Sequence, residues 1–191
     1  MTSITLNLDA IATLTHAQFW ELSLANRDVR LELNAQGRLI VMPPTGWESG
    51  KRNMKLGSRL NVWAEQEGTG VAFDSSTGFR LPNGAVRSPD ASWVKQARLD
   101  ALNLNPESFL PLAPDFAVEL RSASDSTKEL REKMQEYSAN GVRLGWLLNP
   151  QEREVEIYRL GQTVEVLRSP DRLFGEEVLP GFVLELKGIL D

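Results

Sequence analysis

Two acidic residues stand out because each falls on a predicted strand. Asp90 follows a proline at the entry to the strand RSPDASWV, and Glu119 lies in the middle of the strand PDFAVELRS, between Val118 and Leu120. If the two strands are neighbours, both carboxylates would share one face of a sheet. Such a pair could hold Mg²⁺ or Mn²⁺, which prefer oxygen ligands and keep several waters. Carboxylate chemistry with a hard divalent metal is therefore one interpretation of the pair, although neither acid alone is a strong signal.

Each acid also has a simpler structural explanation. Asp90 beside a proline is equally typical of a turn residue whose side chain bonds the nearby backbone. Glu119 is harder to explain in this way, since an acid in the middle of an apolar strand is costly to bury unless it is paired or metal-bound. A partnership along the strand with Arg121, or a salt bridge to another element, remains open for Glu119.

A lysine on the predicted helix STKELREKMQEYSAN is a third candidate. At about 100° per residue, Leu130, Met134 and Tyr137 form its apolar stripe, and Lys133 is the charged residue nearest to that stripe. A lysine there can extend its stem along the edge of the core and keep its ammonium in water. It can also direct its ammonium toward the acidic face of the preceding strand.

A third carboxylate, Glu48, begins the second predicted helix, which runs from about Glu48 to Glu67. It could lie near a metal, but the spacing of Thr45 and Glu48 is that of a capping box, and we favour the capping role. Lys51, Lys55 and Arg59 recur every four residues along the same helix. This basic stripe could follow phosphates, yet such a stripe is more often a solvated helix face, and it carries no interleaved aromatic residues for base stacking.

Composition removes several other kinds of chemistry. The 191 residues include no cysteine and a single histidine, His16, so thiolate nucleophiles, cysteine-based zinc sites and a Ser/His/Asp triad are excluded or hard to build. The formal net charge of −5 provides no overall attraction to nucleic acid, so any nucleic-acid site must be a local patch.

The pattern of elements indicates one α/β domain over residues 1–191. A first helix begins at Thr15, a hairpin turns at Gly37, the second helix ends at Gly68, and a third helix stops at Asn140-Gly141 before further strands. We expect a mixed or antiparallel sheet flanked by helices. We expect no membrane span and no secretory signal, and the cytoplasm is the default location.

Taken together, four motifs closely resemble the Uma-two family of restriction-endonuclease-like proteins in the PD-(D/E)XK nuclease superfamily. They are Pro89-Asp90, PDFAVELRSASDS, REKMQEYSANGVRLGWLLNP and the early MPPTG turn, and the resemblance covers roughly residues 15–186. It implies a restriction-endonuclease-like core, a mixed β-sheet flanked by helices, with extra β-hairpins. It also implies a metal-dependent endonuclease that acts on DNA.

The resemblance assigns roles to particular residues. It implies that Asp90, Glu119 and the Leu120 carbonyl hold Mg²⁺ or Mn²⁺. The superfamily places a lysine two residues after the second acid, where this chain has Arg121, which stays protonated and could clamp a phosphate but cannot act as a base. The resemblance implies that a lysine from the following helix, Lys133, takes the place of the missing lysine.

Further assignments are secondary. Glu48 could add a metal ligand through water, and Lys51, Lys55 and Arg87 are candidates for contacts with backbone phosphates. The competing interpretation is a catalytically inactive nuclease-like module for DNA binding or self-association, which the acidic net charge and Arg121 favour. A homodimer is expected because symmetric dimers are the commonest assembly.

Overall fold

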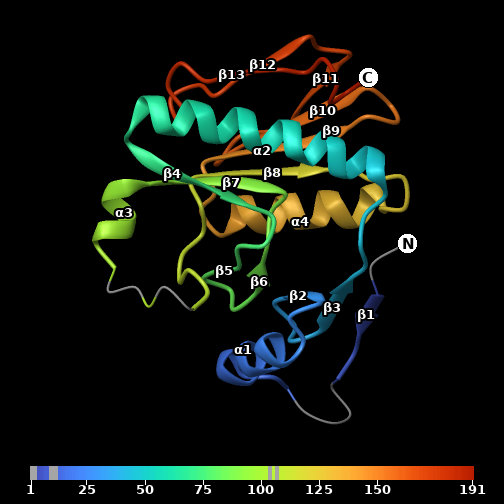
Figure 1. The fold of residues 1–191 in the computed structure, drawn as a ribbon, viewed down its shortest axis with the longest axis vertical. Coiled ribbons are helices and arrows are strands. Elements are labelled where there is room, and N and C mark those ends of the chain that lie inside the picture. The colour runs from blue at the N-terminus through green and yellow to red at the C-terminus, as the bar shows by residue number, and fades with distance from the viewer. Residues whose placement is uncertain (1–3, 9–12, 103–104, 106–107) are drawn as a thin grey trace.

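A six-stranded mixed sheet runs through the middle of the computed structural model, which describes residues 4–8, 13–102, 105 and 108–191 (Figure 1). Its strand order is β11-β10-β9-β8-β7-β4. The strands are β4 (Gly70–Asp74), β7 (Ala91–Lys95), β8 (Phe116–Leu120), β9 (Leu144–Asn149), β10 (Glu154–Arg159) and β11 (Glu165–Arg168). β8 and β9 pair in parallel, and the other neighbours are antiparallel, so the mixed sheet expected from the sequence is confirmed.

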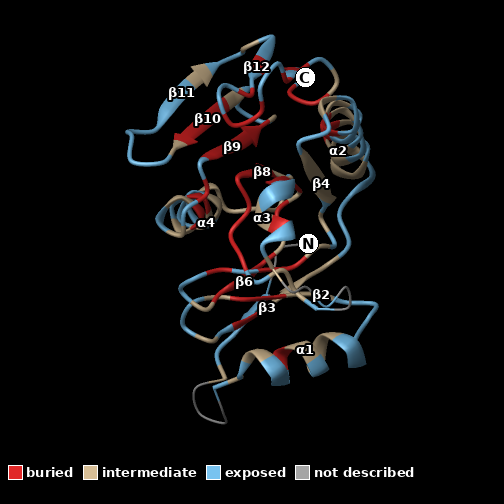
Figure 2. Ribbon diagram, turned by 90° about the vertical axis from the view of Figure 1, so that its left-hand side faces the viewer, coloured by how far each residue is buried: buried red, intermediate tan, exposed pale blue. Residues whose placement is uncertain are grey.

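Helices cover both faces of this sheet. α2 (Trp47–Glu67) lies on one face and α4 (Thr127–Ala139) on the other, and Figure 2 shows burial concentrated in β8, β9 and β10. The alternate residues Phe116, Val118 and Leu120 of β8 join the core cluster on the α2 side. The opposite face, which carries Glu119, is buried as well, so this acid lies inside the protein.

The helix limits follow local signals in the sequence. Thr15 and Gln18 form the expected capping box of α1 (His16–Ala25). α2 ends at Gly68 with φ of +74°, a left-handed conformation that favours glycine. The capping box expected at Thr45 is wrong, because Gly46 is the N-cap of α2 and has no side chain to accept a bond. A short helix, α3 (Gln96–Asp100), follows β7.

A second sheet, formed largely by the N-terminal segment, lies beyond α4. Its order is β1-β3-β2-β6-β5, with β1 (Ile4–Leu6), β2 (Arg30–Leu33), β3 (Leu39–Met42), β5 (Phe79–Arg80) and β6 (Val86–Arg87). β2 and β3 form the predicted antiparallel hairpin. Along β2, Leu31 and Leu33 pack toward Phe19 of α1, while Arg30 and Glu32 point to the opposite face because successive side chains alternate. That polar face is turned toward the central sheet.

A two-stranded hairpin near the C-terminus covers α2. It consists of β12 (Arg172–Phe174) and β13 (Val183–Glu185), which the sequence analysis did not predict. Arg59 of α2 donates to the backbone carbonyls of Glu185 and Lys187, and Arg52 donates to that of Asp191. Within the described part of the chain, no helix combines the length and the apolarity needed to cross a bilayer.

Candidate active site

A cavity of about 1080 Å³ separates the two sheets. Its walls are the polar face of the N-terminal sheet, the first turns of α2, the ends of β7 and β8, and one side of α4. The residues singled out from the sequence that line it are Glu48, Arg87, Asp90, Glu119, Leu120 and Lys133. The structure thus brings the main chemical candidates to one place.

Asp90 and Glu119 meet because β7 and β8 are adjacent. The antiparallel register pairs Ala91 with Val118, so Asp90 lies directly beyond the last pair, beside Glu119. Asp90 Oδ2 accepts the Leu120 N–H at 2.8 Å, and Asp90 Oδ1 accepts from Asn53 Nδ2 at 3.2 Å. The strand neighbourhood on which the metal hypothesis depended is therefore present.

Lys133 points into the same cavity from α4. Its Nζ lies 2.9 Å from Glu119 Oε1 and 2.9 Å from Glu32 Oε1, and the side chain is only 10% exposed. Tyr137, one turn later on the same face, donates its hydroxyl to Glu119 Oε1 at 2.8 Å. The helical geometry placed Lys133 beside the apolar stripe and allowed this direction as one of two. The structure therefore supports an ammonium aimed at Glu119, and Lys133 does not extend into solvent.

Glu32 is a member of the site that the sequence analysis missed. It is 2% exposed and accepts from Lys133 Nζ, from the Ser88 N–H at 3.0 Å and from Arg87 Nη1 at 3.1 Å. A usable signal was present, because Glu32 stands between two leucines in a strand, as Glu119 stands between two apolar residues. The same reasoning about a costly buried acid would have flagged both.

Arg87 is committed to this network and has little freedom to contact a nucleic-acid phosphate. Besides Glu32, it donates from Nε to Glu136 Oε2 at 2.6 Å, and only 8% of the residue is exposed. Asn83 donates to the other oxygen of Glu136 at 3.0 Å. A chain of charge-assisted hydrogen bonds thus runs from Asn83 through Arg87 and Glu32 to Lys133.

The two glutamates that hold Lys133, Glu32 and Glu119, have pKa values shifted in opposite directions. Burial favours the neutral form of Glu32, but the charges of Lys133 and Arg87 outweigh it and lower the pKa of Glu32 to about 2. Burial dominates at Glu119 and raises its pKa to about 7 against the opposing charge of Lys133, with added repulsion from Asp90. Glu32 is therefore an anion at neutral pH, whereas Glu119 gains or loses its proton near neutral pH.

The other two charged groups follow the same logic. Burial raises the pKa of Asp90, although the Leu120 N–H and Lys133 oppose the shift. Burial alone would lower the pKa of Lys133, but the carboxylates of Glu119 and Glu32 outweigh it and raise the pKa. Lys133 is accordingly an ammonium at neutral pH, which favours an electrostatic or hydrogen-bonding role over that of a general base.

The raised pKa of Glu119 leads to a testable pH dependence of stability in metal-free buffer. A raised carboxyl pKa stabilises the fold below the unfolded value of 4.5, and that contribution is lost as the pH rises through about 7. Relative to wild type, Glu119→Gln should therefore gain roughly 1–3 kcal/mol in the free energy of unfolding between pH 5 and pH 8. Urea denaturation at both pH values measures this, with the exposed Glu132→Gln as control. A constant difference between the wild type and Glu119→Gln would contradict it.

Arg121 and Glu48 have different surroundings. Arg121 does not line the cavity, and its guanidinium donates to Asn149 Oδ1 at 3.2 Å and lies 3.7 Å from Glu152. Glu48 lines the cavity, but it lies 2.9 Å from Lys51, in the first turn of α2. The structure therefore does not bring Arg121 to the carboxylates, and Glu48 is engaged by a lysine of its own helix.

The basic stripe on α2 is largely engaged within the protein. Arg59 binds carbonyls of the C-terminal segment, and the side chain of Lys55 packs so closely on Gly188 that an added Cβ there would clash with it. Lys51 lies 5.3 Å from the ring centre of Trp47, which is 77% exposed at the cavity rim. The stripe is thus not a continuous free surface, although an exposed aromatic residue that the sequence analysis overlooked stands beside its first lysine.

The donor set fits a hard cation that keeps part of its water shell. Asp90 and Glu119 offer two carboxylates, and the hydrogen bonds found for Glu119 fall on Oε1, which leaves Oε2 for a ligand. Among the described residues there is no group of three acidic, histidine or cysteine side chains arranged to hold a metal ion. Two carboxylates, the Leu120 carbonyl and water would suit Mg²⁺ or Mn²⁺, whereas a closed zinc cage has no counterpart in this set.

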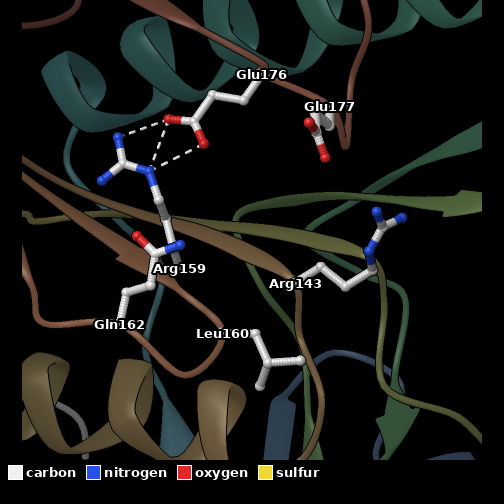
Figure 3. Close-up of a pocket in the computed structure, with 6 residues that line it drawn as sticks. All are labelled: Arg143, Arg159, Leu160, Gln162, Glu176 and Glu177. Atoms are coloured by element: carbon white, nitrogen blue, oxygen red, sulfur yellow. Dashed lines mark hydrogen bonds and ion pairs between the residues drawn. The ribbon is translucent and has the colours of Figure 1, made fainter.

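A smaller hollow of about 520 Å³ lies elsewhere, between the loop after β10 and the segment after β12 (Figure 3). Its charged residues largely neutralise each other, since the Arg159 guanidinium binds the Glu176 carboxylate at 2.6 Å and lies 2.8 Å from Glu165. None of the candidates from the sequence lines it. The chemistry therefore belongs to the larger cavity between the sheets.

Comparisons with known proteins agree with this geometry. A solved structure of a putative nuclease belonging to DUF820 from Anabaena variabilis ATCC 29413 is similar, with a TM-score of 0.77 and 21% identity over 93% of this chain and 97% of that one. At that identity the similarity shows a common fold. No curated protein matches. The family model Uma2, described as "Putative restriction endonuclease", matches residues 16–187, and the chain therefore belongs to this family.

Proposed function

We propose that this protein is a metal-dependent DNA endonuclease that hydrolyses phosphodiester bonds at the cavity between the two sheets. The observation that carries the proposal is the convergence of Asp90, Glu119 and Lys133, with Lys133 Nζ 2.9 Å from Glu119 Oε1 in a largely enclosed position. Membership of a family of restriction-endonuclease-like proteins supports nuclease chemistry, and the carboxylate pair supports dependence on Mg²⁺ or Mn²⁺.

Asp90, Glu119 and the Leu120 carbonyl would hold the cation, which when bound supplies a Lewis acid and a water of lowered pKa. The Leu120 N–H and Asn53 fix the orientation of the Asp90 carboxylate. Tyr137 fixes that of Glu119. The protein's own residues thus hold both acids in place before substrate arrives, which is what electrostatic preorganisation requires.

Lys133 would act as an ammonium in this proposal. Its raised pKa keeps the proton on Nζ at neutral pH, so it can donate to a phosphoryl oxygen or orient the attacking water, and it offsets the negative charge that develops in the transition state. Glu32 and Arg87 lie behind it and hold it in position. In this proposal Lys133, on the following helix, would take the place of the lysine expected two residues after Glu119.

The test is cleavage of supercoiled plasmid and of labelled single-stranded and branched DNA with Mg²⁺ or Mn²⁺. Wild type should cut in the presence of metal, and Asp90→Asn should lose cutting while it remains folded, because one ligand of the cation becomes a neutral amide. Asp171→Asn, an exposed aspartate outside the cavity, is the matched control and should cut like wild type.

The other outcomes are also informative. Equal cutting by all three preparations would indicate a contaminating nuclease. The absence of cutting on every substrate and with both metals would favour the alternative of an inactive DNA-binding or self-association module. The proposal includes a homodimer, which would place two sites on a duplex, and sedimentation equilibrium measures it directly.

A further inference from the structure

The N-terminal sheet contributes an arginine to the cavity that the proposed chemistry does not use. Arg30 begins β2 and lies two residues before Glu32, on the same face of the strand. Both residues line the cavity, while Leu31 and Leu33 between and beyond them pack toward α1. The alternation RLEL thus directs one cation and one anion at the metal-binding carboxylates.

Arg30 differs from the other arginine on this wall, Arg87, in having no ion pair within the described part of the chain. Arg87 is held by Glu32 and Glu136, whereas among the described residues no ion pair or hydrogen bond engages the Arg30 guanidinium. Its Nη2 is buried and finds no hydrogen-bond partner in the residues that the structure describes. A buried N–H of a charged group without an acceptor is costly, so an acceptor from outside the chain is the natural complement.

Arg30 lines the same cavity as Asp90 and Glu119, so its guanidinium borders the space that a ligand of these carboxylates would occupy. Asn53, which donates to Asp90 and also lines the cavity, has a buried Oδ1 that finds no partner among the described residues. Buried polar atoms without a partner in the described part of the chain therefore come from both walls of this cavity.

We propose that Arg30 is a phosphate-binding residue that holds the phosphodiester group of a nucleic-acid strand against Asp90 and Glu119. A guanidinium presents two parallel N–H groups that match two phosphate oxygens, and it stays charged at every working pH. The N-terminal sheet is then the second wall of the substrate site, which binds the backbone while the central sheet carries the cation. This inference rests on the proposed function for the identity of the substrate, but it is tested by binding alone.

The test measures the dissociation constant of a fluorescently labelled oligonucleotide by anisotropy, in Ca²⁺ in place of Mg²⁺ and over a series of salt concentrations. Arg30→Gln should weaken binding by about 10-fold, since a charge-assisted hydrogen bond is lost, and should reduce the salt slope by about one. Arg30→Lys keeps the positive charge but lacks the two parallel N–H groups of a guanidinium. Its dissociation constant should therefore lie between those of Arg30→Gln and wild type. Inorganic phosphate at matched ionic strength is the competitor that separates a free anion from a nucleic-acid backbone.

The matched control is Arg27→Gln. Arg27 is exposed, lies three residues away and does not line the cavity, so this variant has the same net charge as Arg30→Gln. It should bind within about twofold of wild type. If the two variants have equal affinity and equal salt slope, or if wild type binds neither the oligonucleotide nor phosphate, the proposal is overturned. Displacement by phosphate that depends on Arg30 would assign the subsite to a free anion.

The result is separable from that of the cleavage test. A wild type that cuts DNA, together with an Arg30→Gln variant of unchanged KM and salt slope, would reject the role of Arg30 and leave the nuclease standing. A wild type that does not cut but binds DNA through Arg30 would support the phosphate site and reject the nuclease. Thermal unfolding of both arginine variants completes the test, because a purely structural role would lower the Tm without changing the salt slope.

Discussion

A Lys133→Met variant is expected to lose about 3 kcal/mol of unfolding free energy and its metal-dependent cleavage together. Removing the ammonium leaves Glu32 and Glu119 buried side by side, where Lys133 Nζ now lies 2.9 Å from both. Glu119 can reduce the cost by taking up a proton, since burial already raises its pKa to about 7, but Glu32 remains an anion held by Arg87. Urea denaturation and the plasmid assay measure the two effects.

The control for this variant is Lys128→Met on the same helix. The Lys128 side chain is 85% exposed, and its ion pair among the described residues is a surface contact with Glu132. Its loss should therefore change stability by less than about 0.5 kcal/mol and leave cutting intact. Methionine is unbranched and close to lysine in length, which limits packing differences. A Lys133→Met protein as stable and as active as Lys128→Met would show that the ammonium contributes to neither property.

Glu32→Gln is expected to destabilise the fold by about 3–5 kcal/mol near neutral pH. The substitution takes one full charge from between Lys133 and Arg87, which both donate to Glu32 in the wild type. In contrast, Glu119→Gln should cost much less, since a group whose pKa is about 7 is already partly neutral there. Equilibrium denaturation of the two matched Glu→Gln variants compares them directly.

The pH dependence distinguishes the two glutamates further. A depressed carboxyl pKa contributes stability above the unfolded value of 4.5, and the contribution is lost as the pH falls toward about 2. The penalty of Glu32→Gln should therefore shrink in acid, whereas Glu119→Gln becomes relatively more stable as the pH rises. Equal penalties at pH 7 for both variants would show that Glu32 is not the fixed anion of the site.

Local patterns were sufficient to predict much of the fold and part of the site. The helical geometry that put Lys133 beside the apolar stripe was correct because α4 packs that stripe, through Met134 and Tyr137, into the core. Asp90 and Glu119 come together because β7 and β8 are antiparallel neighbours, a pairing that the sequence analysis could state only as a condition.

The remaining members of the site depend on how distant segments dock. Glu32 and Arg30 lie on a sheet whose placement against α4 is encoded by no short motif. Alternation along the strand can assign their side chains to one face of that sheet, but it cannot show which element packs against that face. Arg121 is the opposite case, a residue that the sequence placed near the site and that the structure places elsewhere. The alternation placed it on the face of Glu119, but β8 ends at Leu120 and Arg121 turns to Asn149.

The hydrogen bond between Glu32 and Lys133 joins residues 101 positions apart, and that between Glu32 and Arg87 joins residues 55 apart. The first contact ties the N-terminal sheet to α4, whereas the second lies within that sheet. The direction of the Lys133 ammonium therefore depends on how the N-terminal sheet is docked against α4. A change that loosens this docking is expected to release Lys133 at the same time, even when it lies far from the cavity.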